Sequence, residues 1–357
     1  MNSAHRIIHI SAYALRGGCE KNCFYFIRGS GNYEHEVVVL GQEGPMSSEW
    51  ETVGAVVNHL DILRHDVFTF RAALKKFLAG RKADFAICWT TIRLPMQLNA
   101  LAGIALQVRV HLGNPLGKNY STAKDIVLQW LFPPQKNVKM IACSRHVEVS
   151  HSRSRYFQKF TRRVSLNPVE IPQTVKAGRQ LMQGFRLGMV ARLDPIKDHR
   201  TIIQGCKIIK RAIPDVSLHL VGDGVLRREL EQLVAECGLK ENVWFHGDVS
   251  NVYEYLNNWH IFVYSTTDLE GLGMAVEEAM ANAMPCVLSD QPMLRELAPT
   301  ENLVQWFRPF DAQSFADAVI HLYKDRTRCE ELGQNAFEHA TKQFGVSRFV
   351  TDYLSDE

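Results

Sequence analysis

Residues 261–288 read IFVYSTTDLEGLGMAVEEAMANAMPCVL, and this stretch decides the fold. Ile261–Tyr264 and Pro285–Leu288 are short apolar runs, rich in the β-branched and aromatic residues typical of buried strands. Between them a polar loop leads into Met274–Ala283, which is built from strong helix formers. A strand, a helix and a second strand in this order predict two parallel strands joined by a right-handed crossover.

The same alternation extends in both directions. In the second half the predicted strands are Phe185–Val190, Ser217–Val221 and Val243–His246, and the predicted helices are Thr201–Ala212, Val225–Cys237 and Val252–Asn257. In the first half the predicted strands are Ile7–Tyr13, Glu36–Leu40, Phe85–Trp89, Val108–Leu112 and Met140–Ser144, and the predicted helices are Glu20–Ile27 and Val67–Leu78. The proline-punctuated stretch Asn167–Pro172 and the polar residues 173–183 predict a linker between the halves. The predicted fold class is α/β, with two doubly wound Rossmann-like domains facing a cleft.

The composition of the chain excludes several classes of protein. The 357 residues are 46% apolar and 22% charged, which is typical of a globular protein and excludes an intrinsically disordered chain. The apolar runs are too short to cross a bilayer and the N-terminus lacks a signal-peptide pattern, so we expect a cytoplasmic protein. The eight cysteines are spread along the chain, and we expect isolated reduced thiols.

The two halves differ in charge. Residues 1–180 carry 24 Lys and Arg against 12 Asp and Glu, and residues 181–357 carry 17 against 26. We therefore expect the first half to meet an anionic partner, which could be a lipid surface, a phosphorylated acceptor or a nucleic acid. No nucleic-acid-binding module is recognisable, so we expect no nucleic-acid partner. Two basic clusters, one on the helix 67–78 and one at 153–163, are either solvated charged faces or sites of peripheral contact with an anionic membrane.

The loop after Tyr264 has the residues of an anion-binding turn. Gly271 and Gly273 precede the helix, where glycines allow a ligand to approach the backbone and the first N–H groups attract a phosphate. Glu270 lies in the loop and Glu278 about one turn into the helix, a pair suited to the hydroxyls of a sugar and a ribose. The alternative is that the glycines only turn the chain and that Glu277 and Glu278 are ordinary surface residues of the helix.

Other predicted strand ends carry candidate residues as well. Arg192 and Lys197 follow a strand and form a natural clamp for a diphosphate, unless they are only solvated loop cations. Gly222 follows another strand, in a Gly-x-Gly pattern that by itself indicates a tight turn. Gly17 and Gly18 follow the first strand. His111 lies at the end of another predicted strand, where both a structural and a functional role are possible for a histidine.

Together these segments resemble the family 4 retaining glycosyltransferases of the GT-B fold, with their E-x7-E motif. The matching pieces are Gly17-Gly18-Cys19-Glu20, Arg192-Leu193-x3-Lys197, Val221-Gly222-x-Gly224, Phe245-x-Gly247 and Glu270-x7-Glu278. The match is strong over 185–300 and looser over 1–175. Leu272 stands where the family often has an aromatic residue, and Asp198 replaces a common glycine.

The resemblance implies a role for each matching position. Glu278 would bind the ribose hydroxyls and Glu270 a hydroxyl of the donor sugar, and the backbone of Gly271, Leu272, Gly273 and Met274 would contact sugar and phosphate. Arg192 and Lys197 would stabilise the departing diphosphate. The glycines Gly17, Gly18 and Gly222 belong to the donor-binding set, and His111 resembles the histidine near the reacting sugar.

The predicted function is that of a retaining glycosyltransferase that moves a sugar from a nucleotide-sugar, UDP-linked by preference, to a saccharide or lipid-linked saccharide. No Asp-x-Asp occurs in the chain, so we expect no metal and no cofactor beyond the donor substrate. Two alternatives are a non-catalytic sugar-nucleotide-binding module and a nicotinamide-dependent oxidoreductase, and the incomplete glycine fingerprint weakens the second.

The resemblance also predicts the domains. Residues 1–172 would bind the acceptor, chiefly through loops 41–60 and 112–124, and residues 183–335 would bind the nucleotide-sugar. The helical stretch at the C-terminus (338–357) would cross back to the first domain.

Overall fold

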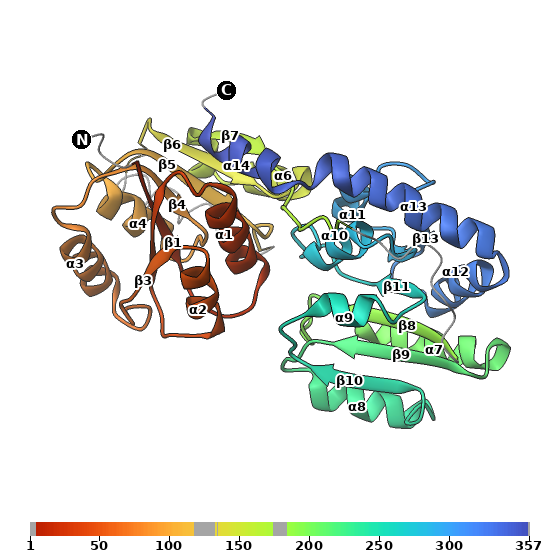
Figure 1. The fold of residues 1–357 in the computed structure, drawn as a ribbon. Coiled ribbons are helices and arrows are strands. Elements are labelled where there is room, and N and C mark those ends of the chain that lie inside the picture. The colour runs from red at the N-terminus through yellow and green to blue at the C-terminus, as the bar shows by residue number, and fades with distance from the viewer. Residues whose placement is uncertain (1–4, 118–132, 134, 174–183, 356–357) are drawn as a thin grey trace. The chain divides into compact units, whose positions relative to one another are not determined.

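The computed structural model describes residues 5–117, 133, 135–173 and 184–355. Internal contacts divide the chain into two compact units (Figure 1). Unit 1 comprises Met1–Pro168 and Val346–Glu357, and unit 2 comprises Val169–Gly345. Each unit is an α/β structure built on its own parallel sheet, so the predicted fold class is confirmed at the level of the two Rossmann-like domains.

Unit 1 contains a seven-stranded sheet in the order β3-β2-β1-β4-β5-β6-β7. Its strands are β1 (Arg6–Ser11), β2 (Glu34–Val39), β3 (Ala55–His59), β4 (Ala83–Cys88), β5 (Ala105–Leu112), β6 (Val138–Ala142) and β7 (Thr161–Val164). Its described helices are α1 (Gly18–Gly29), α2 (Pro45–Thr52), α3 (Val67–Leu78), α4 (Leu94–Leu101), α6 (Arg145–His151), the 3₁₀ turn Phe157–Lys159 and α14 (Val346–Leu354). The strand order reverses between β1 and β4, so the ends of β1 and β4 mark the switch point of this sheet.

Unit 2 contains a six-stranded sheet in the order β10-β9-β8-β11-β12-β13. Its strands are β8 (Phe185–Val190), β9 (Val216–Val221), β10 (Val243–Gly247), β11 (Ile261–Tyr264), β12 (Cys286–Ser289) and β13 (Gln305–Phe307). Its helices are α7 (His199–Ala212), α8 (Arg227–Glu236), α9 (Val252–Leu256), α10 (Met274–Ala281), α11 (Pro292–Leu297), α12 (Ala312–Lys324) and α13 (Arg326–Gln343). Here the order reverses between β8 and β11, which are neighbours in the sheet although about 70 residues separate them along the chain.

The last helix of the chain is part of the core of unit 1. Phe349 and Tyr353 of α14 are fully buried and pack with Phe26 of α1 and Trp89, which follows β4. Gly29 of α1 allows a close approach, because a Cβ atom there would lie 2.5 Å from the side chain of Val346. Three arginines attach the helix to the rest of unit 1. Arg163 donates to the Asp352 carboxylate at 3.1 Å, Arg348 of α14 itself donates to the Leu166 carbonyl at 2.6 Å, and Arg109 donates to the carbonyl of Tyr353 at 2.8 Å.

The structure corrects several sequence-based expectations. The C-terminal stretch predicted as helical at 338–357 belongs to two helices, because α13 ends at Gln343 and α14 begins at Val346 after Gly345. Residues 41–60, which we expected to form a loop, contain α2 and β3. The sequence did not predict them because their few apolar residues show neither a helical nor a strand periodicity. The expected linker residues 174–183 and the part of the loop 112–124 beyond residue 117 lie outside the described residues.

None of the eight cysteines, all of which lie among the described residues, forms a disulfide.

Candidate functional site

The two loops predicted to bind a diphosphate and a sugar are joined to each other. They follow β8 and β11, whose carboxyl ends lie at the same edge of the sheet because the strands are parallel neighbours. Lys197 and Thr266 form an antiparallel bridge between the loops. The Asp198 N–H donates to the Ser265 carbonyl at 3.1 Å, and the Ser265 hydroxyl donates to the Asp198 carboxylate at 2.8 Å. The two loops therefore form one rigid edge.

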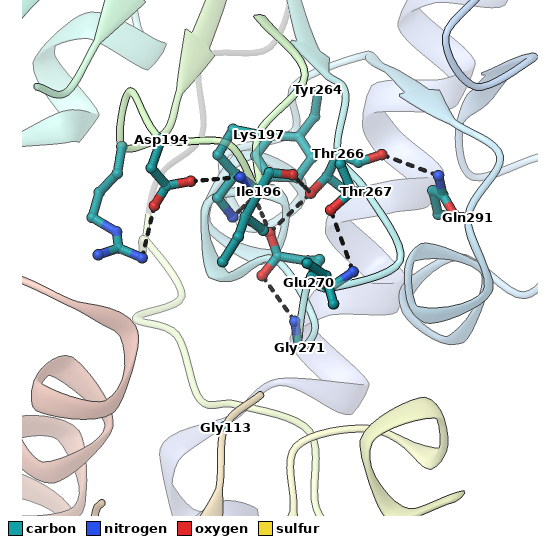
Figure 2. Close-up of polar contacts among 12 residues, drawn as sticks. Gly113, Asp194, Ile196, Lys197, Tyr264, Thr266, Thr267, Glu270, Gly271 and Gln291 are labelled. Atoms are coloured by element: carbon teal, nitrogen blue, oxygen red, sulfur yellow. Dashed lines mark hydrogen bonds and ion pairs between the residues drawn. The ribbon is translucent and has the colours of Figure 1, made fainter. Parts of the chain in front are cut away.

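At the centre of this edge lies a polar cluster of Lys197, Tyr264, Thr266 and Glu270 (Figure 2). The Lys197 ammonium forms an ion pair with Oε2 of Glu270 and lies 2.6 Å from the Tyr264 hydroxyl oxygen. The Tyr264 hydroxyl donates to the same carboxylate oxygen at 2.9 Å. The Gly271 N–H donates to Oε1 at 3.0 Å, so both oxygens of Glu270 are held.

The electrostatics of the cluster keep its groups in fixed charge states. Burial by itself raises the pKa of the Glu270 carboxyl, but the Lys197 ammonium and the hydrogen bonds from Lys197, Tyr264 and Gly271 outweigh it, so that pKa is lowered. Burial and the neighbouring Glu270 carboxylate raise the pKa of the Tyr264 hydroxyl well above its ordinary value. At neutral pH Glu270 is therefore a carboxylate and Tyr264 a protonated phenol.

Arg192 lies in the same loop but has a different partner. Its guanidinium pairs with the Asp194 carboxylate at 2.9 Å, and the Arg192 side chain is 67% exposed. Asp194 also accepts a hydrogen bond from the Ile196 N–H at 3.0 Å, which fixes the turn before Lys197. Arg192 and Lys197, predicted as a clamp, thus follow the same strand, but only Lys197 joins the Glu270 cluster.

The glycine turn leads into α10 as predicted. Gly273 is the residue before the helix and has a φ of +104°, a conformation that favours glycine, and Leu272 is buried at 2% exposure. Met274 begins the helix and Glu278 lies one turn further. Glu277 and Glu278 are both buried, so the alternative that they lie on the surface is wrong.

The structure accounts for Gly222 through packing of the chain on itself. Its φ is +126°, and a Cβ atom there would lie 2.1 Å from the carbonyl oxygen of Ala191. The Gly222 N–H donates to the Gly247 carbonyl at 2.7 Å. A side chain at this position would push apart the loops after β8 and β9.

In unit 1, Gly17 and Gly18 begin α1. Gly17 is the residue before the first turn and Gly18 the first helical residue. A Cβ atom at Gly17 would lie 2.5 Å from a carboxylate oxygen of Glu20, whereas one at Gly18 would meet nothing within 4 Å. The protein itself does not demand a glycine at position 18, so open space remains beside the backbone of the first turn.

His111 is the penultimate residue of β5 and is 2% exposed. Its Nδ1 lies 2.6 Å from the Tyr353 hydroxyl, and its Nε2 lies 3.3 Å from the amide nitrogen of Asn22. Burial lowers the pKa of His111 to about 4, so the imidazole is neutral at physiological pH. A Cβ atom at Gly113 would lie 3.2 Å from Nε2, so glycine there leaves room beside the ring.

Sequence reasoning missed three residues of these networks. Tyr264 was counted only as an apolar strand residue, and the signal that could have found it is its position as the last residue of β11, next to the loop. Thr266 is hidden in a run of small polar residues. Tyr353 lies in the last helix and carries no local signal, because its partner His111 is 242 residues away.

Comparison with known proteins finds a similarity to one family. Residues 176–339, which include most of unit 2, match the family described as glycosyl transferases group 1. The chain is 26% identical over 218 residues to the GDP-mannose-dependent alpha-(1-6)-phosphatidylinositol monomannoside mannosyltransferase of Mycobacterium tuberculosis, covering 55% of this chain and 56% of that protein. It is 27% identical over 165 residues to the N-acetyl-alpha-D-glucosaminyl L-malate synthase of Bacillus anthracis, covering 46% of this chain and 42% of that protein. The chain thus spans about half the length of these relatives.

Solved structures share the whole fold. The crystal structure of Anabaena Alr3699/HepE in complex with UDP and glucose has a TM-score of 0.80 at 18% identity and covers 97% of both chains. The sucrose-phosphate synthase of Thermosynechococcus elongatus has a TM-score of 0.77 at 17% identity, covering 98% of this chain and 97% of that one. The fold is therefore that of the GT-B glycosyltransferases.

None of the described helices is both long enough and apolar enough to traverse a bilayer. Within the same residues, no group of three or more His, Cys, Asp or Glu side chains is placed to hold a metal ion.

Proposed function

We propose that the protein is a retaining glycosyltransferase that moves a sugar from a nucleotide-sugar to a saccharide or lipid-linked saccharide, in the synthesis of a cell-surface polysaccharide or glycoconjugate. The observation that carries the proposal is the cluster in which Lys197, from one loop, meets Glu270, from the other, directly beside the glycine turn. This arrangement offers one cation for a phosphate and one carboxylate for a sugar hydroxyl within a single edge of the sheet. The match of residues 176–339 to the glycosyl transferases group 1 family supports the same function.

Each residue has a stated part in the proposal. Glu278, buried in α10, binds the ribose hydroxyls, and Glu270 accepts a hydrogen bond from a hydroxyl of the donor sugar. The N–H groups from Gly271 to Met274, at the start of α10, face the phosphates, where the helix dipole favours negative charge. Gly17 and Gly18 allow the donor to approach α1, and Gly222 shapes the neighbouring loop.

The departing diphosphate needs positive charge. We assign this task to Lys197 and to Arg192, whose exposed guanidinium can exchange Asp194 for a phosphate by a side-chain rotation. These two cations and the start of α10 would stabilise the leaving group without a metal ion. The acceptor hydroxyl then attacks on the side from which the diphosphate leaves, and a phosphate oxygen takes its proton.

His111 has a neutral ring in this scheme. An imidazole whose pKa is about 4 is unsuited to hold a positive charge near the sugar, but it can exchange hydrogen bonds with a sugar hydroxyl. We therefore propose that His111 orients the donor sugar and takes no proton from the acceptor.

We propose UDP as the nucleotide. The support is the solved structure of similar fold that contains UDP and glucose. The relative from Mycobacterium tuberculosis is named as GDP-mannose-dependent, so GDP-linked donors belong in the same experiment.

An acceptor linked to a lipid would place the protein at a membrane, and one face of α3 fits this role. Phe68 is 80% exposed, and Ala72, Lys75 and Lys76 are exposed on the same side of the helix, at spacings of four, seven and eight residues. An aromatic ring with two ammonium groups suits an anionic lipid surface. The second basic cluster does not fit, because Arg162 pairs with Glu148, Arg163 pairs with Asp352, and the intervening aromatic residues are buried.

The test is product formation from a panel of UDP- and GDP-sugars with free and lipid-linked acceptors, followed by mass spectrometry and by NMR of the anomeric configuration. We expect transfer with retention, unchanged after addition of EDTA. Binding of UDP with neither transfer nor donor hydrolysis across the panel would favour the alternative of a non-catalytic binding module. Inversion at the anomeric carbon would contradict the retaining mechanism.

A further inference from the structure

We propose that Tyr264 is a positioning residue that holds the Glu270 carboxylate in place while Lys197 turns from Glu270 to the diphosphate of the donor. The inference rests on the proposed function, because it assumes that an anionic ligand competes for Lys197. It adds a residue that the glycine turn, the two carboxylates and the two cations do not include.

The directions of the hydrogen bonds in the cluster are determined. An ammonium group can only donate, so the phenol oxygen of Tyr264 accepts from Lys197 at 2.6 Å. The phenol keeps its single proton at neutral pH and therefore donates it to Oε2 of Glu270 at 2.9 Å. Tyr264 is thus the bridge between the cation and the carboxylate.

The Tyr264 side chain is held in place by its surroundings. It is 1% exposed, it ends β11, and its ring stacks on Phe262 with the centroids 6.1 Å apart. The Lys197 side chain, by contrast, comes from a loop and ends in a flexible ammonium group. When the ligand draws the ammonium away, the phenol stays where it is.

When the Lys197 ammonium moves away, the buried Glu270 carboxylate loses the cation that neutralises it. A buried carboxylate without a cation is costly and tends to take up a proton, and a protonated Glu270 would bind a sugar hydroxyl differently. The Tyr264 hydroxyl and the Gly271 N–H remain as donors to its two oxygens. Thr266 helps little, because its one hydroxyl proton is shared with the Ile196 carbonyl at 3.0 Å, closer than the 3.3 Å to Glu270.

The other charges near Tyr264 cannot replace Lys197 at Glu270. Asp194 is itself an anion, and the Arg192 guanidinium pairs with Asp194 in the ligand-free protein and is assigned to the diphosphate when the donor binds. Oε1 of Glu270 accepts from the Gly271 N–H and keeps a second lone pair for a hydroxyl of the sugar. The phenol thus fixes one oxygen while the other one serves the ligand.

The Tyr264→Phe variant separates this role from a merely structural one. In the ligand-free protein, Lys197 still neutralises Glu270, so the proton affinity of Glu270 should rise only slightly. With UDP bound, the carboxylate has lost both the ammonium and the phenol, and its proton affinity should rise about tenfold relative to the wild type with UDP, the scale of one buried hydrogen bond to a charged group. The difference between the two states is the signature of the proposal.

The measurement is an NMR titration of protein labelled with ¹³C at the glutamate carboxyl groups, with and without UDP, with Glu270 assigned by comparison with Glu270→Gln. Tyr323→Phe, at a 43% exposed tyrosine of the same unit, is the matched control and should change neither titration. Replacement of Tyr264 by 3-fluorotyrosine keeps the hydroxyl and strengthens it as a donor, so it should lower the proton affinity of Glu270 in the UDP-bound state. The 3-fluorotyrosine protein also provides the test if the Tyr264→Phe variant does not fold.

The outcomes are distinguishable. An equal change in both states, or no change, with normal binding of UDP to the wild type overturns the role of Tyr264 and leaves the proposed function intact. Failure of the wild type to bind either UDP or inorganic pyrophosphate removes the donor site itself, and the role of Tyr264 with it. A change confined to the UDP-bound Tyr264→Phe protein, reversed in sign by 3-fluorotyrosine, supports the proposal.

Discussion

The hydroxyl oxygen of Tyr353 lies 2.6 Å from Nδ1 of His111, although 242 residues separate them in the sequence. With the Asn22 amide donating to Nε2, the neutral imidazole carries its proton on Nδ1 and donates it to Tyr353. Two residues earlier in β5, Arg109 donates to the backbone carbonyl of the same tyrosine. The last helix of the chain is therefore attached to the strand that presents His111.

The first prediction concerns this bond. Tyr353→Phe leaves the Nδ1 proton of His111 buried without an acceptor, and we expect unit 1 to lose about 1–3 kcal/mol of stability. Thermal and urea unfolding, followed by the fluorescence of Trp50 and Trp89, would measure the loss. Tyr13→Phe, at a tyrosine that is 45% exposed, is the control and should leave the unfolding curve unchanged. A variant as stable as the wild type would show that the bond is not formed in solution.

The second prediction concerns stability in acid. Trp89 donates to Nδ1 of His9, Nε2 of His9 lies 3.0 Å from Nδ1 of His35, and Nε2 of His35 faces the Ser30 carbonyl, so both rings are neutral in the fold. Burial lowers the pKa of His9 well below its ordinary value and also lowers that of His35. The unfolded chain therefore binds more protons than the folded one below pH 6.5, and the stability present above that pH is lost as the pH falls.

Removing the pair should make unfolding less sensitive to acid. In a His9→Gln, His35→Gln variant we expect the slope of unfolding free energy against pH, between about pH 6.5 and 5, to fall by up to about 1.4 kcal/mol per pH unit for each histidine. Urea unfolding at a series of pH values gives this slope, with His65→Gln, an exposed histidine, as the control. The prediction fails if the double variant and the wild type have parallel slopes.

The third prediction concerns the candidate active site. Lys197→Ala removes a cation assigned to the diphosphate, and we expect kcat to fall by about 100-fold to 1,000-fold, the range seen when one group that stabilises a developing charge is removed. Glu278→Ala should weaken the binding of UDP, because it removes the acceptor for the ribose hydroxyls. Lys207→Ala, at an exposed lysine of α7 in the same unit, is the control for charge and should keep wild-type rates. Wild-type transfer by Lys197→Ala would remove the assignment of the site.

The sequence predicted more of the fold than of the candidate site. The alternation of strands and helices predicted two parallel sheets, and loop residues at strand ends such as Lys197 and Glu270 could be paired because parallel neighbours end at one edge. Tyr264 and Tyr353 could not be found in this way. Their apolar rings satisfy the periodic pattern of a buried strand or helix, and only the three-dimensional position of the hydroxyl shows which polar group it meets. The β3 strand was missed for a related reason, since its apolar run Ala55–Val57 is only three residues long and is followed by the polar Asn58–His59.

The last prediction concerns the exposed face of α3, defined by Phe68, Ala72, Lys75 and Lys76. If it docks on an anionic membrane, the wild type should sediment with vesicles of phosphatidylglycerol and phosphatidylcholine, and less so as salt is raised, because exposed charges are screened. Each lysine should contribute about 1 kcal/mol, so the Lys75→Ala, Lys76→Ala variant should bind roughly 30-fold more weakly. Phe68→Ser should weaken binding at every salt concentration, since an apolar contact is not screened by ions. Lys207→Ala, in unit 2, should bind like the wild type. Equal sedimentation of all the variants, or equal binding to vesicles of phosphatidylcholine alone, would assign the membrane contact to another surface or to none.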